Sequence, residues 1–195
     1  KRSVSLAEPR FRIGDYELRE PDYRQIMLWA EELGLEAEEV LYRLEQGVIA
    51  KGFAVENGAV ISLVIDFDSL PLLDFQWVDR LLIREIGFKG KFPGNSNDFF
   101  IKLPQLEVLR CNLIRLTGLD LSAVPTLTTL RCGGNQLTEL DLSAVPALTE
   151  LFCRGNQLTE LDLSAVPALI ELNCGENQLT ELDLSAVPAL TELNC

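Results

Sequence analysis

The chain has 195 residues, of which 47% are hydrophobic, and its 17 basic and 30 acidic side chains give a net charge of −13. The hydrophobic content excludes a disordered chain, and a surface of this charge repels phosphate backbones, so we expect no nucleic-acid partner. No apolar run reaches the ~18 residues of a membrane helix, which predicts no membrane span. The compartment stays open: cytoplasmic, or secreted or at the cell surface if a leader was removed.

The first predicted element is a small hairpin near the N-terminus. A turn at Gly14 would pair Phe11 with Leu18 on one face and Arg12 with Glu17 on the other. An isolated hairpin is only marginally stable, so we expect its apolar face to pack on another element.

Two helices are predicted next. Apolar residues at helical spacing run from Tyr23 to Leu33, with Asp22 as the N-terminal cap and Gly34 as the terminator. The second helix has an acidic first turn and an apolar stripe, and it is expected to end at Gly47.

We interpret residues 1–58, the hairpin and the two helices, as a cap over the open end of a repeat array. A terminal repeat needs such a cover with a polar outer face. The alternative is a separate effector or docking module.

Residues 59–103 are predicted to hold degenerate repeats behind a turn at Asn57-Gly58. Two segments, residues 60–65 and 78–86, fit the spacing LxxLxL, and the second places Leu81 and Ile83 in its strand. Residues 87–100 are expected to form an irregular inserted loop whose phenylalanines fold back on the core.

Residues 104–195 repeat regularly, with a period of 21 residues. The motif LxxLxCxxNxL begins at Leu127, Leu148 and Leu169. A copy at Leu106 has Ile in place of Asn, and a copy at Leu190 is cut short. A second LxxLxL motif fills the other half of each unit. One unit cannot bury its own apolar face, so equivalent leucines must stack on the units above and below.

These motifs resemble the short leucine-rich repeats of bacterial proteins, which carry two nested motifs per unit. The resemblance implies a leucine-rich repeat solenoid: a β-rich, right-handed coil with a parallel sheet, preceded by a small α/β capping region. It also implies that the exposed face of the sheet is the binding surface.

Three sets of repeated residues are predicted to build the scaffold. Asparagines satisfy backbone groups at the turn after each strand, prolines mark the second corner, and cysteines fill an inward core position. We expect no zinc, because the chain has no C-x-x-C and no His, and no disulfides, because neighbouring strands hold Cβ atoms too far apart. The sets are Asn135, Asn156 and Asn177; Pro104, Pro125, Pro146, Pro167 and Pro188; and Cys111, Cys132, Cys153, Cys174 and Cys195.

Two acidic ladders also follow the period. We interpret them as a solvated edge, because stacked carboxylates in water repel one another weakly compared with the stability of a leucine core. The alternative is calcium binding, although no loop supplies converging carbonyl groups. The ladders are Asp120, Asp141, Asp162 and Asp183, and Glu139, Glu160 and Glu181.

Catalysis finds little support in the sequence. Without His, the usual triads and proton shuttles have no base, and no Gly-rich phosphate loop or S-x-x-K motif occurs. We therefore expect no enzyme, no catalytic residues, no metal and no cofactor.

Variation between the copies indicates where a partner binds. The half-unit LTELDLSAVPA is nearly invariant, whereas outward positions around LxxLxC differ and place Arg, Phe and Asn side by side. Phe152 is the expected anchor, with Arg131 and Arg154 beside it. The predicted partner-binding residues are Arg110, Asn112, Arg131, Phe152, Arg154, Asn173 and Asn194.

The leading hypothesis is a module that binds a protein or peptide on this face. One alternative is a merely solvated face. A second is a structural element that assembles through the solenoid end, and a third is the targeting arm of a larger effector enzyme. Because the repeat stops inside a strand motif at Cys195, we expect either that the natural protein continues or that this uncapped edge self-associates.

Overall fold

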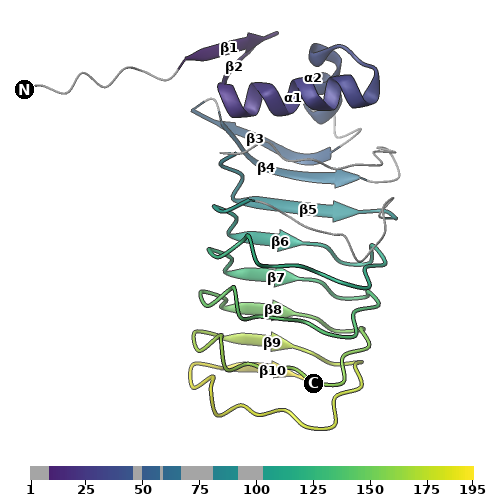
Figure 1. Cartoon of the computed structure of the whole chain (residues 1–195), viewed down its shortest axis with the longest axis vertical. Coiled ribbons are helices and arrows are strands. Elements are labelled where there is room, and N and C mark those ends of the chain that lie inside the picture. The colour runs from purple at the N-terminus through teal and green to yellow at the C-terminus, as the bar shows by residue number, and fades with distance from the viewer. Residues whose placement is uncertain (1–8, 46–49, 58, 67–80, 92–102) are drawn as a thin grey trace, which may run out of the picture.

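A computed structural model describes residues 9–45, 50–57, 59–66, 81–91 and 103–195. Their strands form a two-stranded sheet and an eight-stranded sheet with the order β10-β9-β8-β7-β6-β5-β4-β3. The eight strands stack as successive rows, and the helices lie at the β3 end (Figure 1). The predicted solenoid with a parallel sheet and a small N-terminal α/β region is therefore confirmed.

The two-stranded sheet is the predicted hairpin. Strands β1 (Arg10–Ile13) and β2 (Tyr16–Arg19) pair Phe11 with Leu18 and Arg12 with Glu17, as expected. The ring of Phe11 also stacks on Tyr23, with centroids 5.0 Å apart, so the hairpin packs on the first helix.

Both helices form, but Asp22 does not cap the first one. Helix α1 (Glu20–Leu33) begins three residues earlier than predicted, with Arg19 at its N-cap and Pro21 in its first turn. Proline suits that turn because its missing N–H needs no partner there. Oδ1 of Asp22 instead accepts a hydrogen bond from the backbone N–H of Val60, at 2.9 Å. Gly34 ends the helix with φ 63°, as predicted.

Helix α2 (Ala37–Glu45) buries its apolar stripe in the same hydrophobic core that runs through the solenoid. It packs beside β3, while the Asp22 bond ties α1 to β4. This position suits a cap, and the boundaries 1–58, 59–103 and 104–195 stay a prediction. Gly47, the expected terminator of α2, lies outside the described residues. None of the helices in the described ranges is long and apolar enough to cross a membrane.

Strands β3 (Ala50–Glu56) and β4 (Ala59–Asp66) form an antiparallel hairpin in which Glu56 faces Ala59. Asn57, the described residue of the predicted turn, has φ 50°, and Gly58 lies outside the described residues. From β4 onward each neighbouring pair is parallel.

The predicted register of the second degenerate repeat is wrong. Strand β5 (Glu85–Lys89) places Ile86 beside Leu63 and Phe88 beside Ile65, so the strand lies five residues beyond Leu81 and Ile83. The spacing LxxLxL fits this segment in two frames. All four residues of the two frames are buried, but only the frame with Ile86 and Phe88 in the strand pairs with β4.

The loop predicted for residues 87–100 therefore begins too early, because residues 87–89 belong to β5. Phe88 is buried, as expected for a phenylalanine that returns to the core. Phe92, Phe99 and Phe100 lie outside the described residues.

The regular repeats each contribute one short strand, in register with its neighbours. The middle residue of each strand is a leucine, and those of β6 to β9 are buried. Between rows, the turn after Val124 is closed by a bond from Leu127 N–H to the Val124 carbonyl at 3.1 Å, with Pro125 in the turn. The strands are β6 (Val108–Arg110), β7 (Thr129–Arg131), β8 (Glu150–Phe152), β9 (Glu171–Asn173) and β10 (Glu192–Asn194).

The asparagine ladder is confirmed. Oδ1 of Asn135 accepts bonds from the N–H groups of Ile114 and Leu116, both at 3.1 Å. Its Nδ2 donates to the carbonyls of Cys111 and Cys132, both at 2.8 Å. One side chain thus satisfies backbone groups in its own row and the row before, and Asn156 and Asn177 repeat the pattern.

The cysteines follow the predicted core position in four rows. Cys111, Cys132, Cys153 and Cys174 are buried, whereas Cys195 is exposed, and all five are free thiols. Burial raises the pKa of the Cys111 and Cys153 thiols, so these side chains behave as small core residues.

Candidate binding surface on the sheet

The outward surface of strands β6 to β10 is called the sheet face below. Middle leucines point into the core, so the first and third residues of each strand point outward. The third residues form the predicted column, one per row: Arg110, Arg131, Phe152, Asn173 and Asn194.

The first residues of the strands form a second column that sequence analysis missed. Glu150, Glu171 and Glu192 lie side by side in neighbouring rows. The signal was present, because each Glu lies two residues before a predicted site residue and so shares its face. The sheet face therefore carries arginines over its first rows and carboxylates over its last rows.

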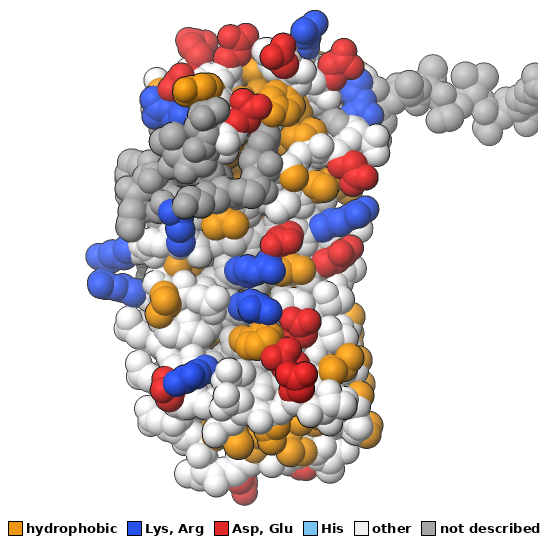
Figure 2. Space-filling view, turned by 180° about the vertical axis from the view of Figure 1, so that it is seen from behind, with side chains coloured by type: hydrophobic (Ala, Val, Ile, Leu, Met, Phe, Trp, Pro, Cys, Tyr) orange, Lys and Arg blue, Asp and Glu red, His pale blue; other side chains and the backbone are white. Residues whose placement is uncertain are grey.

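The arginines are engaged with their neighbours. Arg110 pairs with Glu85, and Arg131 lies 3.6 Å from a carboxylate oxygen of Glu150. The guanidinium of Arg131 also covers the ring of Phe152, 4.3 Å from its centroid. This cation–π contact holds the guanidinium of Arg131 against the ring of Phe152, so these two predicted binding residues form one continuous surface. Figure 2 shows basic, apolar and acidic side chains gathered along one side of the solenoid.

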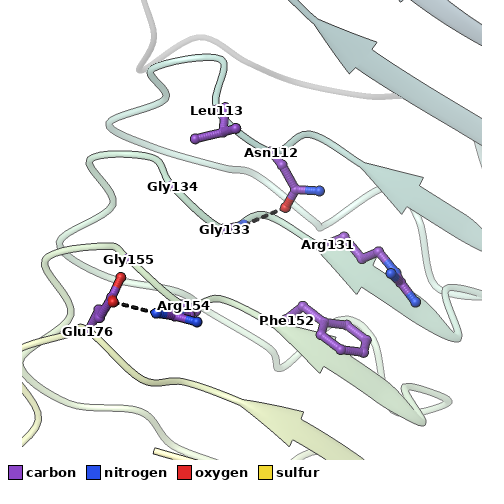
Figure 3. A pocket seen from close by; sticks show the side chains of 9 residues that line it. All are labelled: Asn112, Leu113, Arg131, Gly133, Gly134, Phe152, Arg154, Gly155 and Glu176. Carbon is purple, nitrogen blue, oxygen red and sulfur yellow. Dashed lines mark hydrogen bonds and ion pairs between the residues drawn. The ribbon is translucent and has the colours of Figure 1, made fainter.

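A shallow hollow of about 440 Å³ opens beside the strand ends (Figure 3). It brings together four of the seven predicted residues, while Arg110, Asn173 and Asn194 lie outside its lining. Leu113 and Glu176 line it without having been predicted. The lining consists of Asn112, Leu113, Arg131, Gly133, Gly134, Phe152, Arg154, Gly155 and Glu176.

One repeat position in this lining has a left-handed backbone in four successive rows. Leu113 has φ 58°, Gly134 66°, Gly155 71° and Glu176 54°. Glycine adopts this conformation freely, whereas an L side chain there costs about 1–2 kcal/mol. Two copies therefore carry a side chain where the backbone favours glycine, and both side chains line the hollow.

Arg154 and Glu176 form an ion pair at the rim of the hollow (Figure 3). Their hydrogen bond raises the pKa of Arg154 and lowers the pKa of Glu176. Both side chains are more than half exposed, so solvent screens the pair and it adds little stability.

A second hollow, of about 980 Å³, lies along the predicted acidic ladders. Asp141, Asp162 and Asp183 each accept a bond from the backbone N–H of the serine two residues on, at 2.8 Å, which lowers their pKa. Among the described residues, no three His, Cys, Asp or Glu side chains converge as a metal site. No geometry in this part of the chain favours the calcium alternative.

Comparison with known proteins shows which repeat family and which solved structures the chain is similar to. Residues 125–165 match the family model for leucine-rich repeats. The functional domain of InlJ from Listeria monocytogenes, described as including a cysteine ladder, is 25% identical. It superposes with a TM-score of 0.52 over 90% of this chain and 40% of that one. An internalin, InlF, from the same species is 22% identical, with a TM-score of 0.44 over 57% of this chain and 33% of that one. No curated protein matches the chain.

The repeats are thus leucine-rich repeats, which confirms the resemblance drawn from the sequence. The buried cysteines of this chain parallel the cysteine ladder of InlJ. The chain spans less than half the length of either solved structure.

Proposed function

We propose that this leucine-rich repeat protein is a binding module, not an enzyme, and that it recognises a protein or peptide on its sheet face between Arg110 and Asn194. The hollow carries the proposal: it gathers four of the predicted residues around exposed apolar and cationic groups. Aromatic residues and arginine are enriched at the centres of protein interfaces.

The pattern of variation supports the same surface. Inward positions repeat Leu and Cys from row to row, while the outward column changes from Arg to Phe to Asn. Backbone hydrogen bonds hold each row on the next, so these side chains stand on a rigid frame. A rigid surface lowers the entropy cost of binding.

The test begins with a partner captured from the source cells by crosslinking and purified. Its dissociation constant is then measured for the wild type, Phe152→Ala and Arg154→Glu. We expect each variant to weaken binding at least tenfold, because Phe152 supplies the central ring and Arg154 a rim charge.

Thr159→Ala is the matched control, since Thr159 is exposed and lines the acidic hollow instead. It should bind like the wild type. Unchanged affinity for Phe152→Ala and Arg154→Glu, with melting temperatures preserved, would reject the sheet face as the binding surface.

A further inference from the structure

We infer that the hollow between Leu113 and Phe152 recognises an acidic peptide segment, one that inserts an apolar side chain and presents a carboxylate to Arg131 and Arg154. The inference rests on the proposed function and names the chemistry of the partner.

The apolar part of the site is built at a cost to the fold. Leu113 is 75% exposed and adopts φ 58°, a conformation that disfavours a leucine. Its side chain reaches over the next row, where a Cβ on Gly134 would lie 2.3 Å from Leu113 Cδ2. An exposed leucine in a strained backbone adds little to the core. Strain of this kind is concentrated at functional sites.

The floor of the hollow lacks side chains. Gly133 and Gly134 are adjacent in one row, and Gly155 follows in the next. A Cβ on Gly133 would lie 3.0 Å from the carbonyl oxygen of Arg154, so the rows approach closely here. Leu113 and Phe152 thus stand as two apolar walls beside a floor of glycine backbone (Figure 3).

The charged part of the site retains donors. The Arg131 side chain is partly exposed, and its contact with Glu150 at 3.6 Å is an ion pair longer than a hydrogen bond, so its terminal N–H groups remain able to donate. Arg154 donates one N–H to Glu176, and a guanidinium has five donors. The lining holds two arginines and one glutamate, and Glu150 beside Arg131, outside the lining, makes the surroundings neutral in a chain of −13. A carboxylate on the partner can accept from the remaining guanidinium N–H groups and is repelled less here than on the rest of the acidic surface.

The experiment uses the full chain labelled with ¹⁵N and titrated with blocked peptides in an NMR experiment. The probe is acetyl-Gly-Glu-Leu-Glu-Gly-amide. One comparison peptide replaces both glutamates with lysine, and another replaces the leucine with serine. The amide signals of Gly133, Gly134 and Gly155 report on the floor of the hollow. We expect the probe to shift these three signals with a half-saturating concentration at least fivefold below that of either comparison peptide.

Two variants separate recognition from folding. Leu113→Gly relieves the strain and removes one wall, so it should raise the melting temperature while weakening probe binding at least fivefold. Arg154→Gln should weaken the probe while leaving the lysine peptide unaffected. Arg24→Gln is the matched control, since Arg24 is an exposed arginine on α1.

Equal or stronger shifts from the lysine peptide, or no shift of the three glycine signals by the probe, would overturn the inference. Neither result would touch the proposed function, which is judged separately by the captured partner and Phe152→Ala. A captured partner that binds Phe152→Ala normally would reject the proposed function itself.

Discussion

Leu113 is an exposed side chain in a backbone conformation that is unfavourable for leucine. In the next two rows the same position is glycine, and in the row after it is Glu176. The four residues share a left-handed backbone, so the turn sets the conformation and the side chain must accept it. Leucine gains little in return, because it is largely exposed.

Replacing Leu113 with glycine should therefore stabilise the protein. The relieved strain exceeds the entropy that glycine adds to the unfolded chain, which leaves a gain of up to about 1 kcal/mol. That gain corresponds to a rise in melting temperature of roughly 2–4 °C for a chain of this size. Thermal unfolding followed by circular dichroism measures it.

Leu113→Ala is the comparison, because alanine keeps the strain and removes most of the side chain. It should not melt above the wild type. If glycine destabilised the protein as much as alanine, packing of Leu113 against Gly134 would outweigh the strain.

Single residues also mark where sequence patterns stop being informative. Asp22 satisfies the local rule for a helix cap, yet its carboxylate bonds to Val60, 38 residues away. Leu113 itself carries no sign of its left-handed backbone, and only the glycines at the same position in the next two copies indicate it. In both cases the informative residue lies in another row or element.

At the scale of the element, the asparagine ladder joins consecutive rows. Asn156 accepts a bond from Leu137 N–H at 3.1 Å and donates to the carbonyls of Cys132 at 3.0 Å and Cys153 at 2.8 Å. These backbone groups lie in turns, where the regular hydrogen bonds between strands do not reach them. The side chain is buried, so water cannot replace it.

Asn156→Ala should cost roughly 1–3 kcal/mol of the free energy of unfolding, because it leaves the buried Leu137 N–H without a partner. It also removes one of the two bonds that each of the carbonyls of Cys132 and Cys153 accepts, since Asn135 and Asn177 supply the other. Urea unfolding measures the loss. The adjacent Gln157 is exposed, so Gln157→Ala should change the free energy by less than about 0.5 kcal/mol. A loss for Asn156→Ala no larger than for Gln157→Ala would show that the turn holds itself without the ladder.

The regular rows could be predicted from sequence because each position is repeated. Asn135, Asn156 and Asn177 report the same environment three times, and the buried cysteines report theirs four times. The degenerate rows offer no such repetition. Strand β5 is displaced by five residues from its predicted frame because two overlapping segments satisfy one motif.

The candidate surface also has a part that could be predicted from the sequence and a part that could not. The column from Arg110 to Asn194 could be predicted, since alternate residues of a strand share a face and the third residue of each strand points outward. The Glu150, Glu171 and Glu192 column follows from the same parity and was overlooked. The hollow could not be predicted, because it depends on turns whose backbone conformation leaves no mark in the hydrophobic pattern.

At the scale of the whole molecule, one core runs from the helices through the rows, and Asp22 links its two parts. Oδ1 of Asp22 bonds to β4, whereas Oδ2 is buried without a hydrogen-bond partner. Burial raises the pKa of Asp22 above its usual value of 3.8, although the Val60 bond opposes the shift. At neutral pH, the charged carboxylate therefore weakens the attachment of the N-terminal region.

The sign of the pH dependence follows. Between its unfolded and folded pKa, Asp22 binds more protons in the folded state, so its contribution to stability falls as pH rises through that window. Asp22→Asn keeps an oxygen acceptor for Val60 N–H and removes the charge. We expect it to be more stable than the wild type at pH 7.

The advantage of Asp22→Asn should shrink as the pH approaches 3.8, where the native carboxyl is protonated too. Urea unfolding of both proteins at pH 7 and pH 4 checks this. Asp22→Ala, which removes the acceptor, should be less stable than Asp22→Asn at both values. An advantage that grew at low pH would contradict the assigned burial effect.

The parallel, in-register pairing of the rows also fixes the spacing between the contacts that an extended partner can make. Rows lie about 4.8 Å apart, whereas an extended peptide advances about 3.3 Å per residue. A peptide that runs across the strands comes back to the same position relative to a row only after about three of its residues, which span about two rows. Successive side chains of an extended peptide point to opposite faces, so the same face returns to the same position relative to a row after about six residues and four rows. Equivalent contacts with the sheet face should therefore recur at about every sixth position of an extended partner.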